Sequence, residues 1–155
     1  FLKRWENKSH PSKQDLNLAW EIANGTVRMK LALDHLLSQC EQKIRLKSKE
    51  RLLFHTALYQ YYFMDRVPLY AIVDETVQIA QRLIHPIFAK FINAILRKLE
   101  KMTLTLPEGN LSVRYSFPDY FVEALIDDYG LEQAKQIDEC CIHTLPVCVD
   151  ITQTL

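Results

Sequence analysis

The sequence has little glycine and proline and no long run of apolar residues. Of its 155 residues, 3 are glycine and 6 are proline, unlike collagen, low-complexity or disordered chains. No stretch approaches the roughly 18 uninterrupted apolar residues of a membrane-spanning helix. Residues 1–8 carry charges instead of the apolar segment of a signal peptide. We therefore expect a globular cytoplasmic chain, without a membrane partner, that is a piece of a longer protein.

The four cysteines and five histidines lack the spacing of a metal site. Cys140 and Cys141 are adjacent, which is poor geometry for a mutual disulfide. We expect reduced, buried thiols and no bound metal. His55 lies within an apolar helical pattern, which is more typical of a core or boundary histidine than of a ligand.

What the sequence does have is abundant apolar residues and unevenly distributed charge. Apolar residues make up 48% of the chain, and a chain of this size buries roughly 68–70% of its unfolded surface. Up to Thr103 there are 17 basic and 10 acidic residues, whereas from Leu104 onward there are 2 and 9. This division indicates that the first part contacts a polyanion. The alternative is that the two parts attract each other within one fold.

Helical periodicity extends as far as Cys141. Ser12 followed by Asp15 predicts the start of a long helical stretch that reaches Leu37, with a kink or a join at Gly25. Further helices are predicted over residues 48–64, 69–83, 87–101, 118–129 and 131–141, with a connector at 103–113. Pro146 and the β-branched residues after it predict a strand at 147–151.

The predicted helix 87–101 has two contrasting sides. Seven apolar residues, from Phe88 to Met102, fall within an arc of about 140°. Lys90, Arg97 and Lys101 align within about 40° on the opposite side, with Asn93 beside them. No acid stands among these three cations, which form a basic stripe, although the exposed faces of soluble helices usually mix signs. The pattern favours a phosphate-binding surface over a merely solvated one.

Several short segments, in their order along the chain, resemble a known helical domain. They are Ala57-Leu-Tyr-Gln60, Asp65-Arg-Val-Pro68, Val73-Asp-Glu-Thr-Val77 and the block from Lys90 to Arg97. Together they resemble the NusB-like domain, which occurs as the NusB antitermination factor. It also forms the N-terminal part of the bacterial 16S ribosomal RNA cytosine-C5 methyltransferases (the RsmB, Sun or Fmu family).

The C-terminal third resembles the methyltransferases more than the antitermination factor. Arg114-Tyr-Ser-Phe-Pro-Asp-Tyr120, followed by a helix that ends at Tyr129-Gly130, looks like their linker to the next subdomain. The following segment departs from the family. Cys141-Ile142, Leu145-Pro146 and Asp150-Ile-Thr152 stand where the family has an Asn pair, a Pro pair and an Arg-x-Asn strand.

The resemblance implies a fold in two parts. We expect an all-α, NusB-like helical bundle at residues 1–103. Residues 104–155 would form the linker and the first helices and strand of a truncated α/β subdomain, the start of the methyltransferase N-terminal subdomain.

The resemblance also implies a reaction, the transfer of a methyl group from S-adenosylmethionine to C5 of a cytosine. In that reaction a cysteine thiolate adds to C6 of the base. None of Cys40, Cys140, Cys141 and Cys148 stands in the family's Pro-Cys or Thr-Cys motif. Three glycines supply no glycine-rich turn for the cofactor. We expect the fragment itself to be non-catalytic and without cofactor, with S-adenosylmethionine bound by the full-length protein.

The predicted role of the fragment is to bind 16S ribosomal RNA through basic side chains. The RNA-binding candidates are Arg28, Lys30, Lys43, Arg45, Lys47, Lys49, Arg51, Lys90, Asn93, Arg97 and Lys101. The Asn93 side chain has two alternative hydrogen-bond partners, either a phosphate or base edge of the RNA or the backbone within the bundle.

Two other functions stay open. One is a transcription antitermination factor that binds RNA and a ribosomal protein, and the other is a protein-interaction scaffold. An apolar face that the family's first helix would cover predicts self-association of the fragment.

Overall fold

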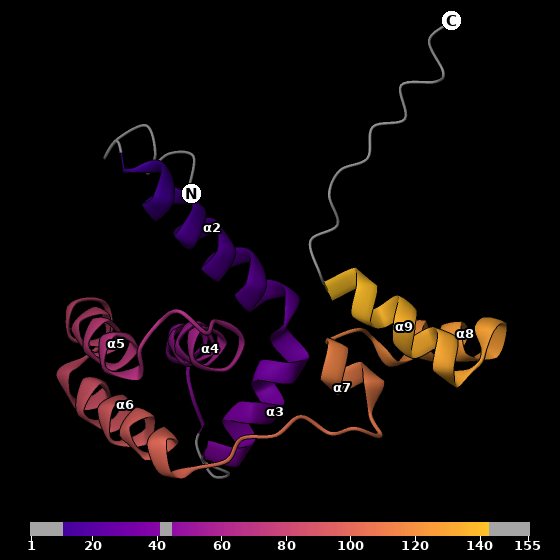
Figure 1. Cartoon of the computed structure of the whole chain (residues 1–155). Coiled ribbons are helices and arrows are strands. Elements are labelled where there is room, and N and C mark those ends of the chain that lie inside the picture. Colours follow the sequence, from indigo (N-terminus) through magenta and orange to yellow (C-terminus); the bar gives the residue numbers. More distant parts are fainter. Residues whose placement is uncertain (1–10, 41–44, 143–155) are drawn as a thin grey trace, which may run out of the picture. The chain divides into compact units, whose positions relative to one another are not determined.

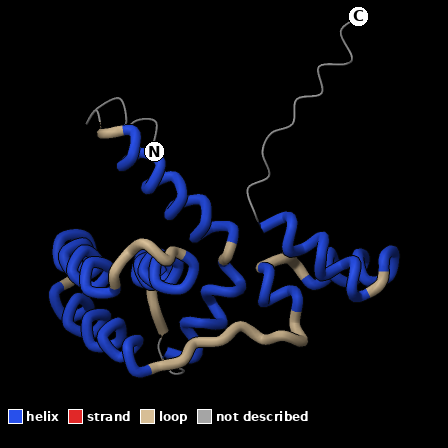
Figure 2. The backbone as a smooth tube through the Cα atoms, in the orientation of Figure 1, coloured by secondary structure: helices blue, strands red, loops and turns tan. Residues whose placement is uncertain are grey.

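The computed structural model of the chain describes residues 11–40 and 45–142. Helices account for most of these residues, and no strand occurs among them (Figure 2). The predicted all-α architecture is therefore confirmed for this part of the chain. Lys43, Cys148 and the strand expected at 147–151 lie outside the described residues.

The chain divides into two compact units, a bundle unit at residues 1–106 and a second unit at residues 107–155. The division follows Leu106, whereas the sequence suggested Thr103. Two contacts tie the intervening residues to the bundle unit. Leu104 is buried, and the Gln39 amide bonds both backbone groups of Thr105, donating to its oxygen at 2.7 Å and accepting from its nitrogen at 3.2 Å.

The bundle unit is built around a central helix. Its elements are α2 (Lys13–Arg28), α3 (Lys30–Cys40), α4 (Ser48–Phe63), α5 (Leu69–Leu83), α6 (Pro86–Lys98) and the 3₁₀ turn η1 (Leu99–Lys101). Figure 1 shows α4 between the α2–α3 pair and α5, with α6 packed along α5. The core includes Leu33, Phe54 and Ile92, which are fully buried. Phe54 contacts Phe88 edge-on, with ring centroids 5.9 Å apart.

The break between the first two helices lies at Met29, so the prediction that Gly25 marks it was wrong. The α2 helix continues through Gly25 to Arg28. A Cβ atom at Gly25 would lie 1.9 Å from Cζ of Tyr59 on α4. Glycine is needed there because the two helices approach closely, and not because the chain bends.

Most predicted helix starts are confirmed. Asp15 N donates to Ser12 Oγ at 3.1 Å, which caps α2. Pro68 precedes α5 and Pro86 opens α6. The α4 helix begins at Ser48, and Lys47 stands at its N-cap position. The preceding residue, Lys47, donates its backbone N–H to Glu50 Oε2 at 2.7 Å.

The predicted apolar face of α6 is confirmed. Phe88, Ile92, Ile95, Leu96 and Leu99 are buried, because this face packs against α5 and the rest of the core. The helix ends earlier than expected, at Lys98, and its last turn tightens into η1. Tyr61 donates its hydroxyl to the Leu99 carbonyl at 3.0 Å, a partner from α4 for this tightened turn.

The second unit contains α7 (Leu111–Tyr115), α8 (Asp119–Tyr129) and α9 (Leu131–Ile142). The short α7 begins within the predicted connector 103–113 and extends two residues beyond it. Asn110 caps it by accepting a hydrogen bond from Val113 N at 2.9 Å. Gly130 separates α8 from α9 at φ 78°, a left-handed conformation that favours glycine.

Candidate nucleic-acid interface

The predicted basic stripe lies along α6 and η1 and is called the α6 stripe below. It is exposed as predicted. Lys90, Arg97 and Lys101 all lie on the surface, opposite the buried face of α6. Half-buried Asn93 bonds a side chain of its own helix. Its Oδ1 accepts a hydrogen bond from Arg97 Nε at 3.0 Å, which leaves the amide N–H groups of Asn93 available as donors.

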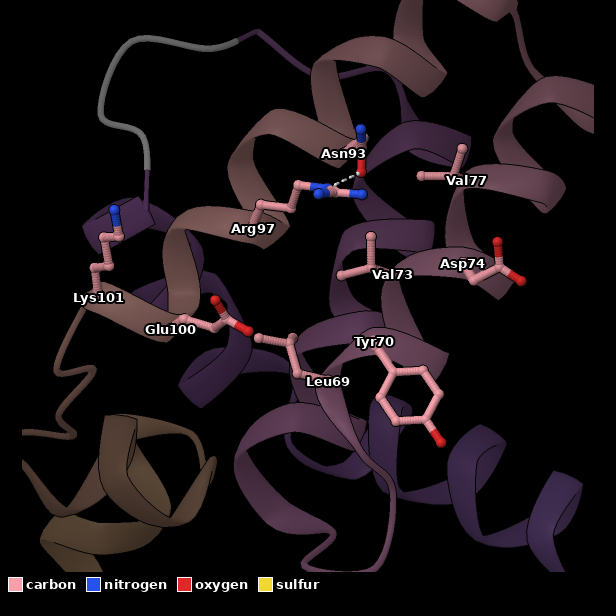
Figure 3. Close-up of a pocket in the computed structure, with 9 residues that line it drawn as sticks. All are labelled: Leu69, Tyr70, Val73, Asp74, Val77, Asn93, Arg97, Glu100 and Lys101. Carbon is pink, nitrogen blue, oxygen red and sulfur yellow. Dashed lines mark hydrogen bonds between the residues drawn. The ribbon is translucent and has the colours of Figure 1, made fainter.

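The stripe borders a groove of about 500 Å³ between α5 and α6. Figure 3 shows the hydrogen bond between Asn93 and Arg97 there, and Lys101 pointing away from the other lining side chains. The groove also contains two acids, Asp74 and Glu100. The sequence pattern of one helix could not show Asp74, because Asp74 comes from α5, whereas Glu100 lies within the predicted helix 87–101 beside the stripe. A phosphate would therefore contact the outer edge of the stripe more readily than the groove itself.

A second group of predicted residues meets at an acid. Asp34 on α3 lies 2.9 Å from Lys30 Nζ and 3.2 Å from Arg51 Nη1. His55 Nε2 lies 3.1 Å from the same carboxylate, without the alignment of a hydrogen bond. These four residues are called the Asp34 cluster below. The acid neutralises one of the two cations that the sequence placed at an RNA surface.

Burial and charge act in opposite directions within the Asp34 cluster. Burial disfavours the Asp34 carboxylate, but the hydrogen bond from Lys30 and the charges of His55, Lys30 and Arg51 outweigh it and hold its pKa below 3.8. Burial lowers the pKa of His55 below 6.5, since the attraction of Asp34 does not compensate for desolvation and for the nearby Arg51 and Lys30. The folded protein therefore favours a neutral imidazole beside an ionised carboxylate.

The remaining predicted cations are exposed and lie elsewhere on the bundle unit. Lys47 and Lys49 line a groove with His85 and Phe88, where the start of α4 faces the start of α6. Arg28 and Arg45 are on the surface and form no ion pair with another described residue. Apart from Arg28 and Arg45, the described candidates lie at three places, namely the α6 stripe, the Asp34 cluster and the start of α4.

Sequence reasoning missed three residues near these cations, namely Thr26, Asp34 and His55. The sequence carried one signal for His55, because the spacing of Ser48, Arg51 and His55 places all three on one face of α4. The spacing within α4 does not indicate that Asp34 on α3 or Thr26 on α2 lies near this face, since that depends on how the helices pack.

The cysteines differ in their surroundings. Cys40 is buried as expected, and burial raises its pKa to about 11, which favours the thiol over the nucleophilic thiolate at neutral pH. Cys140 and Cys141 are exposed on α9, so the expectation that they are buried was wrong.

Across the described ranges, no three His, Cys, Asp or Glu side chains are grouped to hold a metal. No described helix is long and apolar enough to cross a membrane.

Comparison with known protein families matches residues 2–101 to the NusB family. The chain belongs to this family. It is 31% identical over 153 residues to the probable ribosomal RNA small subunit methyltransferase B of Bacillus subtilis, covering 94% of this chain and 34% of the relative. It is 36% identical to ribosomal RNA small subunit methyltransferase B of Vibrio cholerae, covering 81% of this chain and 30% of the relative. The chain spans about a third of the length of these relatives.

Proposed function

We propose that this chain is the RNA-binding, targeting domain of an S-adenosylmethionine-dependent 16S ribosomal RNA cytosine-C5 methyltransferase. One observation carries the proposal. The Bacillus subtilis relative, named a probable methyltransferase, matches 94% of this chain, whereas the match to the NusB family ends at residue 101. The similarity to that relative therefore includes most of the second unit. A single NusB-type antitermination factor does not account for this shared extension.

The chain's part in the reaction is to bind and orient RNA. Cations on an exposed helix face neutralise backbone phosphates, and these contacts position an RNA without specifying its sequence. If the bundle unit engages about four to six phosphates, the logarithm of the association constant falls against the logarithm of the salt concentration with a slope of roughly −3 to −5. We propose ribosomal RNA as the partner of the chain and the cytoplasm as the place where they meet.

Methyl transfer itself belongs to other parts of the full-length protein. None of the described glycines stands at a strand-to-helix turn that could hold S-adenosylmethionine. The bound cofactor would supply the methyl group. The buried Cys40 does not suit the nucleophile, because burial raises the pKa of its thiol. Exposed Cys140 and Cys141 do not stand in the Pro-Cys or Thr-Cys motif of the family.

The test is RNA binding by a variant without the α6 stripe. We expect the triple variant Lys90→Gln, Arg97→Gln, Lys101→Gln to bind a 16S helix fragment more weakly and to lose about one unit of salt slope per phosphate contact removed. Lys98→Gln is the control, since Lys98 is exposed on the same helix but outside the stripe. Gel-shift titration over a salt series measures both. Unchanged affinity and slope in the triple variant would contradict the proposal.

A further inference from the structure

A pocket of about 450 Å³ lies in the bundle unit between the α2–α3 join and the first half of α4. The charged side chains that line it are at its mouth, since those of Lys30 and Arg51 are 63% and 49% exposed. The polar side chains of Thr26 and His55 are buried and form its floor. Exposed Val27 and Leu52 provide apolar walls. We call this site the α4 pocket.

The floor of the α4 pocket carries polar atoms without hydrogen-bond partners. Thr26 is 3% exposed and His55 is 5% exposed. Among the described residues, Thr26 Oγ1 forms no hydrogen bond. His55 Nε2 lies 3.1 Å from the Asp34 carboxylate without the alignment of a hydrogen bond. Buried polar groups without a hydrogen bond are rare in native proteins and carry a cost in stability. A ligand that bonded both atoms would remove this cost.

The mouth of the α4 pocket retains positive charge. Lys30 and Arg51 share a single acid, Asp34, which does not itself line the pocket. Two cations against one carboxylate leave one net charge, and Arg51 has further guanidinium N–H groups to donate. An anion at the mouth would therefore be attracted, and phosphate suits the planar donors of arginine.

From these features we infer that the α4 pocket binds one unpaired nucleotide of an RNA strand. Its phosphate contacts Lys30 and Arg51, its base lies between Val27 and Leu52, and the base edge bonds Thr26 Oγ1 and His55 Nε2. The volume exceeds what a phosphate alone requires, and RNA is read largely through bases that leave the stack. The inference rests on the proposed RNA binding and adds a base-reading site to contacts that only orient the strand.

The experiment uses the whole chain labelled with ¹⁵N and the four ribonucleoside 5′-monophosphates as probes. We expect at least one of them to shift the backbone amide signals of Thr26, Lys30 and Arg51 in a saturable way. Thr26→Val should weaken that binding about fivefold, the equivalent of one neutral hydrogen bond, and Arg51→Gln about tenfold. Lys98→Gln, which alters a cation outside the pocket, should bind as the unmodified chain does.

Thr26→Val also separates binding from folding. Because Thr26 Oγ1 bonds none of the described residues, the variant should unfold at the same or a higher urea concentration while it binds nucleotide more weakly. Unchanged nucleotide affinity in this variant would overturn the inference. Shifts confined to other parts of the chain would overturn it too, as would inorganic phosphate binding as tightly as every nucleotide.

These outcomes are independent of those for the proposed function. If removal of the α6 stripe weakens binding of the 16S fragment but no nucleotide perturbs the α4 pocket, the inference fails and the proposed function stands. If nucleotides occupy the α4 pocket but the stripe variant binds the fragment as tightly as before, the α6 interface fails instead.

Discussion

Gly25 lies where α2 approaches α4 so closely that a Cβ atom would fall 1.9 Å from the Tyr59 ring. Tyr59 has little room to move, since it is 6% exposed and stacks on Phe63 with centroids 5.5 Å apart. At the scale of single residues, packing therefore decides the identity of this position. The same holds for His55, whose protonation depends on the residues that surround it.

Gly25→Ala should destabilise the bundle unit. Overpacking costs about 1–3 kcal/mol, while alanine recovers up to about 1 kcal/mol of helix propensity, so we expect a net loss of about 1–2 kcal/mol. Urea unfolding followed by circular dichroism measures it. Gly109→Ala is the control, because nothing lies within 4 Å of a Cβ at that position. A more stable Gly25→Ala variant would mean that the helices do not approach this closely.

The pKa values in the Asp34 cluster predict a loss of stability in acid. The pKa of His55 is lowered below 6.5 by burial, so between its folded pKa and 6.5 the unfolded chain binds the proton more strongly. Stability then falls as the pH drops through this window. The lowered pKa of Asp34, below 3.8, adds a second loss with the same sign at lower pH. Urea midpoints from pH 4.5 to 8 should show the upper step, and His55→Gln should remove it.

At the scale of elements, local residues mark the start of α7 and the end of α8 in the second unit. Asn110 caps α7 and Gly130 ends α8. The α9 helix contains an exception, because Asp138 is fully buried and its carboxylate oxygens bond no described residue. Burial raises the pKa of Asp138 above 3.8. Desolvation of the Asp138 carboxylate therefore lowers the stability of the unit.

Asp138→Leu should stabilise the second unit by about 1–3 kcal/mol, because it removes a buried carboxylate that bonds none of the described residues. The pH dependence of stability that Asp138 causes has the opposite sign to the one that His55 causes. The folded unit binds a proton at Asp138 more strongly than the unfolded chain does, so this residue costs less as the pH falls through its folded pKa. Thermal unfolding of the variant and of Glu139→Gln, an exposed neighbour, tests this. Equal melting temperatures for Asp138→Leu and the unmodified chain would contradict it.

At the scale of the whole molecule, the end of the bundle unit depends on contacts distant in sequence. Leu104 is buried, and Gln39 holds the backbone of Thr105 with two hydrogen bonds. The family resemblance placed the domain boundary at Thr103. Packing instead extends the bundle unit through Leu106.

A chain cut after Leu106 should therefore keep the stability of the bundle unit, whereas one cut after Thr103 should lose about 2–4 kcal/mol. The loss combines burial of one leucine side chain with two hydrogen bonds. Urea unfolding of the two truncated chains makes the comparison. Equal stability would show that residues 104–106 contribute nothing to the bundle.

The sequence by itself determined the helices, their order and the family, because helical periodicity, caps and short motifs are local properties of the chain. It located the exposed α6 stripe for the same reason, since the position of a residue on one helix follows from its number. Only the tertiary structure decided that Asp74 lines the α5–α6 groove together with Arg97, that Asp34 gathers Lys30, Arg51 and His55, and that Gly25 serves packing. Contacts between helices depend on crossing geometry and close packing, which no periodicity within a single helix records.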